Sequence, residues 1–247
     1  MDDTESHLSQ IVSRSLYAGR ARRVMGNGTD GVWVGTVFTP ETGAFPATMF
    51  APQRGMPSTP LPRFVLQHHH PFGGFETMLV STDGSCLGNG RAGARAGWAF
   101  IFRPGPEGVV SGALEQQGPD GEWHGATSNR AELRAVIAAL EFRAWWAEGW
   151  ERIVIATDSE YVANGATEWL RRWAACGWRT ARGLPVQNRD LWERLSERMG
   201  MCAKGGCEVS FWWVPRALNA EADRAAKAAA EDGRIEVEYT TQLSMAV

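Results

Sequence analysis

The sequence predicts an α/β fold with a mixed β-sheet, and the order of its apolar segments is the main reason. Three strand-like segments that can form hairpins come first, and a long amphipathic helix follows them. After this helix the chain alternates strand, helices, strand and helix. Hairpins make antiparallel neighbours and strands separated by helices make parallel ones, so one sheet is expected to hold both kinds. The composition, 44% hydrophobic and 21% charged, is typical of a globular domain.

The first predicted elements after residue 75 are three short strands. Residues 78–82 and 97–102 are rich in residue types that favour strands, and residues 122–126 are a shorter third candidate. The first strand is followed directly by Asp83 and Gly84. Glycine permits turn conformations that other residues resist, so we expect this strand to end on the Asp83 carboxylate.

The spacing of apolar residues predicts the first helix, over residues 127–149. They recur at i, i+3, i+4 and i+7 on one face: Leu133, Val136, Ile137 and Leu140. Gly149 is a suitable stop for this helix. The elements expected after it are a strand at 152–157 that ends before Asp158, helices at 160–175 and 188–199, a fifth strand at 208–214, and a helix from 220. We expect Asn219 to cap that last helix and Gly233 to end it.

Residues 1–75 differ in composition from the rest of the chain. They contain seven of the 12 prolines, are rich in glycine and threonine, and lack a sustained helical period. We expect an irregular extension at 1–75 with one short strand at 31–38, then an α/β domain at 76–233 and a tail at 234–247. The run His68, His69 and His70 is expected to be a solvated linker, because three adjacent side chains cannot all face one ion.

Charge and cysteine usage exclude several classes of protein. The net charge is −3 and the pI about 6.0, so any nucleic-acid partner needs a local basic patch. The four cysteines are scattered, which argues against a zinc site or a disulfide framework and favours an intracellular compartment. The nucleus, cytoplasm and mitochondrion all remain open. The start is acidic, unlike a secretory signal, and no apolar run is long enough to span a membrane.

Four acids lie at element ends or in early helix turns, where they can converge. Asp83 and Asp158 follow two strands that are expected to be neighbours, and Glu132 and Asp223 lie near the starts of two helices. Carboxylates at close quarters repel one another unless a cation neutralises them, and oxygen ligands suit Mg²⁺ or Mn²⁺. Two such ions can clamp a phosphodiester. Taken singly, each of these acids is more often a structural residue.

Five stretches, in this order, resemble the ribonuclease H family: TDGSCLGNG, TSNRAEL, ATDSEYV, EWLRRWAACGWRTARGLPVQNRDLWERL and NAEADRAAK. The resemblance covers residues 76–232. It implies a type 1-like domain with a five-stranded mixed sheet flanked by helices, and hydrolysis of the RNA strand of RNA–DNA hybrids. It also implies that the four acids bind metal. Asn89 and Asn129 match positions that touch the hybrid's minor groove, Thr127 matches one that holds a DNA phosphate, and Ser128 replaces a frequent asparagine.

A local basic segment supports a nucleic-acid surface on this acidic chain. Five arginines occur between Glu168 and Asp190 with no acid among them: Arg171, Arg172, Arg179, Arg182 and Arg189. Trp169 and Trp173 lie beside them, and the stretch GWRT contains Arg179 and Thr180. We expect these four residues to contact the substrate. Arginines bind phosphates and aromatic faces pack on sugars or bases. The segment resembles the family's basic protrusion; alternatively Trp169 and Trp173, at i and i+4, belong to the core.

The loop before the last helix departs from the family pattern. Many relatives have a histidine there, whereas this chain has VPRALNAEAD, with Arg216 as a possible phosphate ligand. We expect His124 to have a structural or surface role rather than to substitute for this histidine, because of its expected strand position. The preferred hypothesis is a monomeric metal-dependent endoribonuclease. The alternatives are a weak or inactive module that binds hybrid or double-stranded RNA, and a related fold that acts on DNA.

Overall fold

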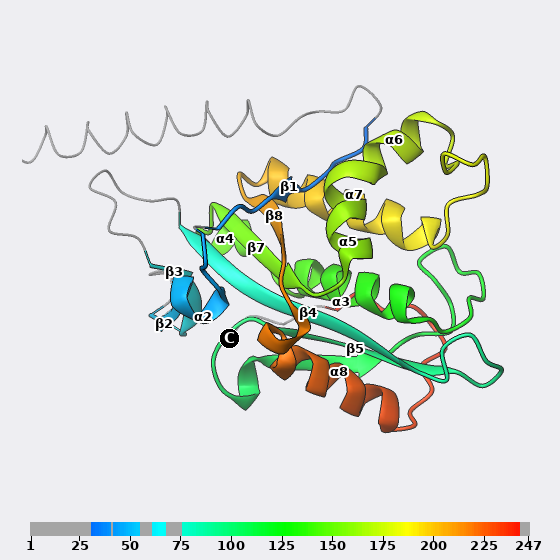
Figure 1. The fold of residues 1–247 in the computed structure, drawn as a ribbon, viewed down its shortest axis with the longest axis horizontal. Coiled ribbons are helices and arrows are strands. Elements are labelled where there is room, and N and C mark those ends of the chain that lie inside the picture. The colour runs from blue at the N-terminus through cyan, green and yellow to red at the C-terminus, as the bar shows by residue number, and fades with distance from the viewer. Residues whose placement is uncertain (1–30, 41, 55–60, 68–75, 243–247) are drawn as a thin grey trace, which may run out of the picture.

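The computed structural model describes residues 31–40, 42–54, 61–67 and 76–242. The run His68–His70 lies outside these residues. Within them one mixed sheet holds eight strands (Figure 1). The strands are β1 (Thr36–Val37), β2 (Phe50–Gln53), β3 (Arg63–Leu66), β4 (Thr77–Leu87), β5 (Arg95–Ile101), β6 (Val109–Ala113), β7 (Arg152–Thr157) and β8 (Glu208–Trp213).

Strand β4 is the centre of the sheet. Its first half pairs in parallel with β7, which pairs in parallel with β8. On its other side β4 pairs antiparallel with two strands in succession, first with β3 and then with β5. The hairpin partner β6 lies beyond β5. This arrangement confirms the predicted α/β fold, because the parallel pairs are those whose strands are separated by helices.

Helices cover both faces of the sheet. They are α2 (Pro46–Met49), α3 (Ser128–Phe142), α4 (Trp145–Glu148), α5 (Glu160–Asn164), α6 (Leu170–Ala175), α7 (Arg189–Lys204) and α8 (Ala220–Glu231). A Cβ atom on Gly84 would meet the backbone of α3, and one on Gly97 would meet that of α8. Gly84 pairs with Trp98, the neighbour of Gly97, and side chains alternate along a strand. Helices α3 and α8 therefore pack on opposite faces.

Two of the elements predicted between residues 97 and 149 need correction. The third strand is β6, and residues 122–126 form a loop with a single β-bridge between Gln117 and Trp123. Val109–Ala113 was missed because its serine and glycine weaken the strand pattern, and pairing with β5 decides its conformation. The helix expected up to Gly149 is broken after Phe142 by Arg143, whose backbone is extended. Gly149 does end the second piece, α4, in the left-handed conformation.

The helix expected at 160–175 contains a π-helical turn at Gly165–Trp169, between α5 and α6. A Cβ atom on Gly165 would lie 2.1 Å from the ring of Trp192. The close packing of this indole against the glycine backbone accompanies the wider turn, and π-turns of this kind are rare in helices. Helix α7 also runs five residues further than the expected end at residue 199.

The described part of the N-terminal extension is not irregular. It contributes three strands and a second small core on the sheet face away from α3. The buried members of this core are Phe50, Leu79, Val154, Ala156, Trp212 and Val214. Strand β1 lies within the predicted segment 31–38 and pairs in parallel with β8. Before it, the Trp33 backbone N–H donates to Ser196 Oγ on α7 at 2.8 Å. The extension therefore covers an edge and a face of the sheet.

The hairpin β2–β3 is tied to the rest of the fold by Arg63, whose side chain is fully buried. Its Nη2 lies 3.2 Å from Glu148 Oε2 on α4, and its guanidinium lies over the rings of Phe102 and Trp145. Removing one member of a buried ion pair leaves an uncompensated charge in a poorly hydrated site. Arg63 therefore holds the extension by charge as well as by packing.

Removing one partner of a buried ion pair usually costs about 3–5 kcal/mol of stability. We expect Arg63→Met to lower the free energy of unfolding by about 2–3 kcal/mol, at or just below that range, because Arg143 still contacts Glu148. Urea denaturation followed by tryptophan fluorescence measures this. Arg54→Met is the matched control, since Arg54 is exposed just after β2. Equal stability of the two variants would show that the extension is held by its apolar contacts alone.

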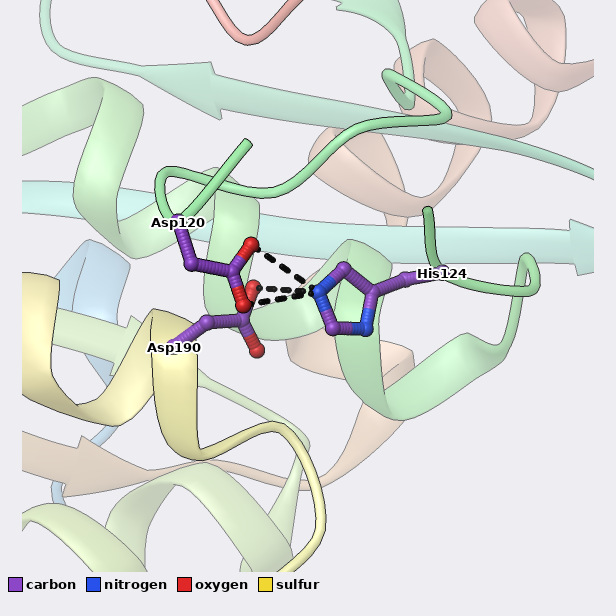
Figure 2. A group of neighbouring side chains, drawn as sticks. All are labelled: Asp120, His124 and Asp190. Atoms are coloured by element: carbon purple, nitrogen blue, oxygen red, sulfur yellow. Dashed lines mark hydrogen bonds and ion pairs between the residues drawn. The ribbon is translucent and has the colours of Figure 1, made fainter. Parts of the chain in front are cut away.

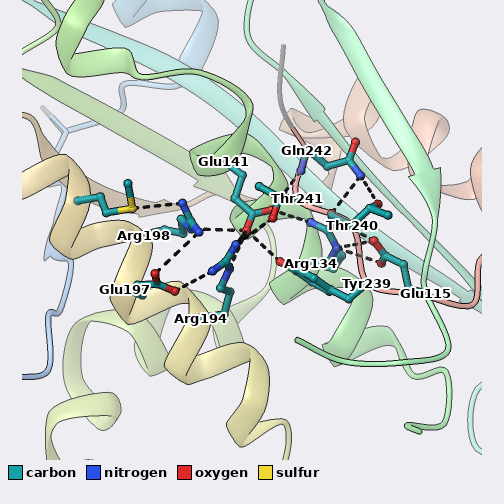
Figure 3. Close-up of polar contacts among 11 residues, drawn as sticks. Glu115, Arg134, Glu141, Arg194, Glu197, Arg198, Tyr239, Thr240, Thr241 and Gln242 are labelled. Carbon is teal, nitrogen blue, oxygen red and sulfur yellow. Dashed lines mark hydrogen bonds and ion pairs between the residues drawn. The ribbon is translucent and has the colours of Figure 1, made fainter. Parts of the chain in front are cut away.

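The C-terminal tail packs on the helices as far as residue 242, although the sequence predicted no structural role for it. Arg134 donates to the Thr240 carbonyl at 2.7 Å, and the Tyr239 hydroxyl donates to Glu141 Oε1 at 3.1 Å. Figure 3 shows Glu141 between arginines of α3 and α7, with the tail crossing beside them. Arg194 of α7 also donates to Thr241 Oγ1 at 3.1 Å, so the tail contacts both α3 and α7. None of the helices in the described ranges is long and apolar enough to cross a bilayer.

Candidate active site

Asp83 lies in the middle of β4, not at the end of a strand. The strand continues to Leu87, and Asp83 pairs with Ala99 on β5. Gly84 makes no turn; a Cβ atom there would lie 2.1 Å from the backbone nitrogen of Glu132. The glycine is needed because α3 packs directly on the strand at this point. Because Gly84 has no side chain, the first turns of α3 can lie beside Asp83.

Three acids meet where β4, β7 and α3 come together. Asp158 follows the last residue of β7, the parallel neighbour of β4, and Glu132 lies in the second turn of α3. One carboxylate oxygen from each of Asp83, Glu132 and Asp158 lies within 4.8 Å of the other two. Acids from three distant parts of the sequence thus form one compact group.

The group is costly to ionise without a cation. Burial raises the pKa of Asp83 to about 8, and the hydrogen bond and charge of Asp158 add to this effect. The pKa of Glu132 is also raised well above its usual range. Burial is the largest cause, and the charges of Asp83 and Asp158 add to it. Glu132 Oε2 is buried and has no hydrogen-bond partner among the described residues. An unpartnered oxygen beside two other carboxylates is the donor set that a hard divalent cation fits.

Asp223, the fourth predicted ligand, lies in the first turn of α8 but outside this compact group. Its carboxylate forms an ion pair with Arg216, an exposed side chain from the short turn before α8. Asp223 is still close enough for its charge to raise the pKa of Asp83, while Arg216 opposes that shift. The structure therefore places Asp223 and Arg216 at the margin of the acid group.

The residues predicted to touch the sugar and phosphate lie at the start of α3 and the loop after β4. Thr127 is the N-cap of α3, and its side chain accepts a hydrogen bond from Arg130 N at 3.2 Å. Asn89 Oδ1 accepts a longer bond, 3.4 Å, from Ser128 N. Asn129 is exposed. The structure thus brings these four residues to one surface, next to the turn of α3 that carries Glu132.

The basic segment forms α6 and the loop that follows it. Arg171, Arg172 and Arg182 are exposed, and the exposed Arg179 donates to the Gly183 carbonyl at 2.7 Å. Thr180 Oγ1 is buried without a hydrogen-bond partner in the described part of the chain. The segment is therefore a solvent-facing cationic surface held together by its own loop.

The two tryptophans beside this segment are largely structural. Trp173 packs against the main core, with its ring centroid 5.4 Å from that of Trp192. Trp169 lies 5.6 Å from Trp173 and 6.4 Å from Tyr161. Both rings are only partly exposed. Most of the surface of both rings is therefore covered by neighbouring residues, as the core alternative for these tryptophans predicts.

Two residues that hold Asp158 were missed by sequence reasoning. Asn219 Nδ2 donates to Asp158 Oδ1 at 3.1 Å, and Trp213 Nε1 donates to the Asp158 carbonyl at 3.2 Å. Asn219 was expected to cap α8, and it stands at the N-cap position, but its side chain makes no capping bond. An asparagine just before a helix predicts a capping role, so nothing in the local sequence indicates its contact with Asp158.

A second group of ligand-type side chains lies between the loop before α3 and the start of α7. His124 Nε2 lies 3.1 Å from Asp120 and 3.5 Å from Asp190. Figure 2 shows both carboxylates directed toward the imidazole. Both oxygens of Asp190 already accept bonds from Arg130, at 2.9 and 2.7 Å. A guanidinium so close opposes a bound cation. This group is therefore an ion-pair network that joins α3 to α7, and His124 lies in a loop rather than a strand.

Comparisons with known proteins address the same part of the chain. The family model described as RNase H matches residues 76–231. A "Ribonuclease H" of Paracidovorax citrulli is 40% identical over 137 residues, which cover 56% of this chain and 80% of that protein. A "Ribonuclease HI" of Xylella fastidiosa is 40% identical over 144 residues, 58% of this chain and 81% of that protein. The crystal structure of LC9-RNase H1 matches with a TM-score of 0.46 and 29% identity, covering 66% and 76% of the two chains.

Proposed function

The chain belongs to the ribonuclease H family of endonucleolytic hydrolases, and from this premise we propose that it cleaves the RNA strand of RNA–DNA hybrids by a two-metal-ion mechanism with Mg²⁺. Mn²⁺ is the expected substitute. The observation that carries the proposal is the gathering of Asp83, Glu132 and Asp158 oxygens within 4.8 Å, with Glu132 Oε2 buried and unpartnered among the described residues. Asp223 completes the proposed ligand set from the margin of the group.

Each part of the site has a distinct task in this proposal. Asp83, Glu132 and Asp158 would hold the cations, which would supply activation of the attacking water and neutralisation of the leaving oxygen. The exposed Asn129 and the nearby Asn89 face the groove of the hybrid, where an amide can both donate to and accept from a 2′-hydroxyl. Thr127 and Ser128 offer hydroxyls to a phosphate of the DNA strand. Recognition by sugars and phosphates predicts weak sequence preference.

Arg216 occupies the loop where many relatives have a histidine. Its guanidinium stays charged at neutral pH, so it can hold a phosphate but cannot shuttle a proton. General acid–base assistance is worth about 10²–10⁴-fold, which bounds the rate lost with that histidine. The missing histidine is also what favours the second candidate, a binding module with weak or no catalysis. The complete set of acids favours the enzyme.

A cleavage assay separates these functions. Purified full-length protein is incubated with end-labelled RNA–DNA hybrid, duplex RNA or duplex DNA, each with Mg²⁺, with Mn²⁺ and with EDTA. We expect cleavage of the RNA strand of the hybrid alone, and only with a divalent ion. Binding of hybrid without cleavage under both ions would favour the module, and cleavage of duplex DNA would favour a different nuclease. Size-exclusion chromatography tests the expected monomer.

The exposed arginines of the basic segment are proposed to bind backbone phosphates. We expect the double variant Arg171→Ala/Arg182→Ala to bind hybrid more weakly at low salt and to reduce the slope of log K against log salt by about 1–2, close to one unit per lost contact. Fluorescence anisotropy between 50 and 300 mM KCl measures the slope. Arg54→Ala, at an exposed position of the β2–β3 hairpin away from α6 (Figure 1), is the control. An unchanged slope would remove this segment from the interface.

A further inference from the structure

We propose that Asn219 is a positioning residue for the metal-binding carboxylates: its side-chain amide fixes Asp158 relative to the backbone of β4 beside Asp83. This inference rests on the proposed function and goes beyond it. The side chain is only 2% exposed. Its Nδ2 donates to the Thr82 carbonyl at 2.9 Å and to Asp158 Oδ1 at 3.1 Å. One amide therefore contacts β4 next to Asp83 and the Asp158 carboxylate just after β7.

The position of Asn219 corresponds to a gap in the sheet. The register between β4 and β7 runs from Thr77 with Arg152 to Ser81 with Ala156 and stops there. One residue beyond this pair β7 ends, at Thr157, and the chain turns toward α5, while β4 continues to Leu87. The Thr82 carbonyl thus lies past the last ladder pair, and the Asn219 amide bridges the point where the strands separate.

The orientation of the amide follows from its partners. A backbone carbonyl and a carboxylate can only accept hydrogen bonds, so the Asn219 nitrogen and not its oxygen must face them. A donor to Oδ1 of Asp158 fixes the rotation of that carboxylate relative to β4. Asn219 Oδ1 is itself buried with no partner among the described residues. This oxygen remains free to accept a bond from a ligand of the assembled site.

Asn219 also connects these two aspartates to the fourth acid. Its backbone carbonyl accepts the bond from Asp223 N at 3.1 Å, in the first turn of α8. The same residue therefore links Asp158 through its side chain and Asp223 through its backbone. Trp213 supports this arrangement from β8 by binding the Asp158 carbonyl. Hydrogen-bond partners of metal ligands generally raise metal affinity by orienting those ligands.

The test is a direct measurement of metal binding by Asn219→Ala, with Mn²⁺ as the titrant in isothermal calorimetry. We expect Mn²⁺ affinity to fall about 10–100-fold, the usual effect of removing a residue that orients a metal ligand. The Mn²⁺ concentration that gives half-maximal hybrid cleavage should rise by a similar factor, while excess Mn²⁺ restores much of kcat. Asn219→Asp, which has the same shape but no donor, should bind Mn²⁺ no better than Asn219→Ala.

Asn164→Ala, on the half-buried last residue of α5, is the matched control and should bind Mn²⁺ as the wild type does. Circular dichroism and thermal unfolding show whether each variant is folded. If folded Asn219→Ala loses stability but keeps wild-type Mn²⁺ affinity, the residue is only structural and the inference is wrong. If the wild type itself binds no Mn²⁺, the proposed metal site fails and this inference fails with it.

Discussion

Asp83→Asn is expected to abolish metal-dependent cleavage of RNA–DNA hybrid while the fold stays intact. The substitution keeps the shape of the side chain and removes the charge that a divalent cation needs at the centre of the acid group. Metal ions supply several kcal/mol of transition-state stabilisation, so the loss should reach at least about 10³-fold at 1.4 kcal/mol per factor of ten. A single-turnover assay with labelled hybrid, at saturating Mg²⁺ and protein, measures this rate.

Asp158→Asn should give the same loss, because its carboxylate lies in the same group. Asp232→Asn is the matched control: Asp232 is an exposed residue just after α8 that pairs with Arg234. Hybrid binding by the inactive variants in EDTA should persist, since the basic segment and the start of α3 are unchanged. Wild-type turnover by either folded variant would contradict the roles assigned to these aspartates.

The order of elements and the closeness of Asp83, Asp158 and Glu132 could be predicted from local sequence. The metal-binding role of the four acids was implied by the resemblance to the ribonuclease H family, and it stays a prediction. Asp83 and Asp158 each follow a run of strand-forming residues, and strands separated by a helix pair in parallel, which brings both residues to one region of the sheet. The early position of Glu132 in an amphipathic helix was equally visible. These features depend on period and spacing within a few residues, which a single sequence displays.

The features that were missed depend on contacts between distant parts of the chain. Asn219 donates to a backbone carbonyl 137 positions away in the sequence, and nothing near Asn219 indicates that partner. Gly84 looks like a turn residue until α3 is seen to pack on it. Strand β3 lies in a proline-rich region and forms because it pairs with the start of β4, whereas β5 pairs with the later part of the same long strand. In each case tertiary packing overrides the local preference.

The metal-free protein should become less stable as the pH rises from about 4 to 8. In the folded protein the Asp83 carboxyl has a pKa of about 8, against an ordinary value of 3.8. Between these values the folded state keeps a proton that the unfolded state has released. The stability that this proton provides is fully present below the ordinary pKa and is lost as the pH rises through the folded one, by up to about 1.4 kcal/mol per pH unit.

Asp83→Asn cannot lose this proton, so its stability relative to the wild type should increase steadily between pH 5 and 8 and level off above that. Urea denaturation in EDTA at pH 5, 6, 7, 8 and 9 measures the difference, and Asp232→Asn should show no comparable trend. At pH 8 added Mn²⁺ should stabilise the wild type, because a ligand of the folded state adds RT ln(1 + [L]/Kd), and should stabilise Asp83→Asn much less. If the stability difference between Asp83→Asn and the wild type does not change with pH, Asp83 is already ionised in the folded, metal-free protein. The repulsion among the three carboxylates would then have to be offset by another group.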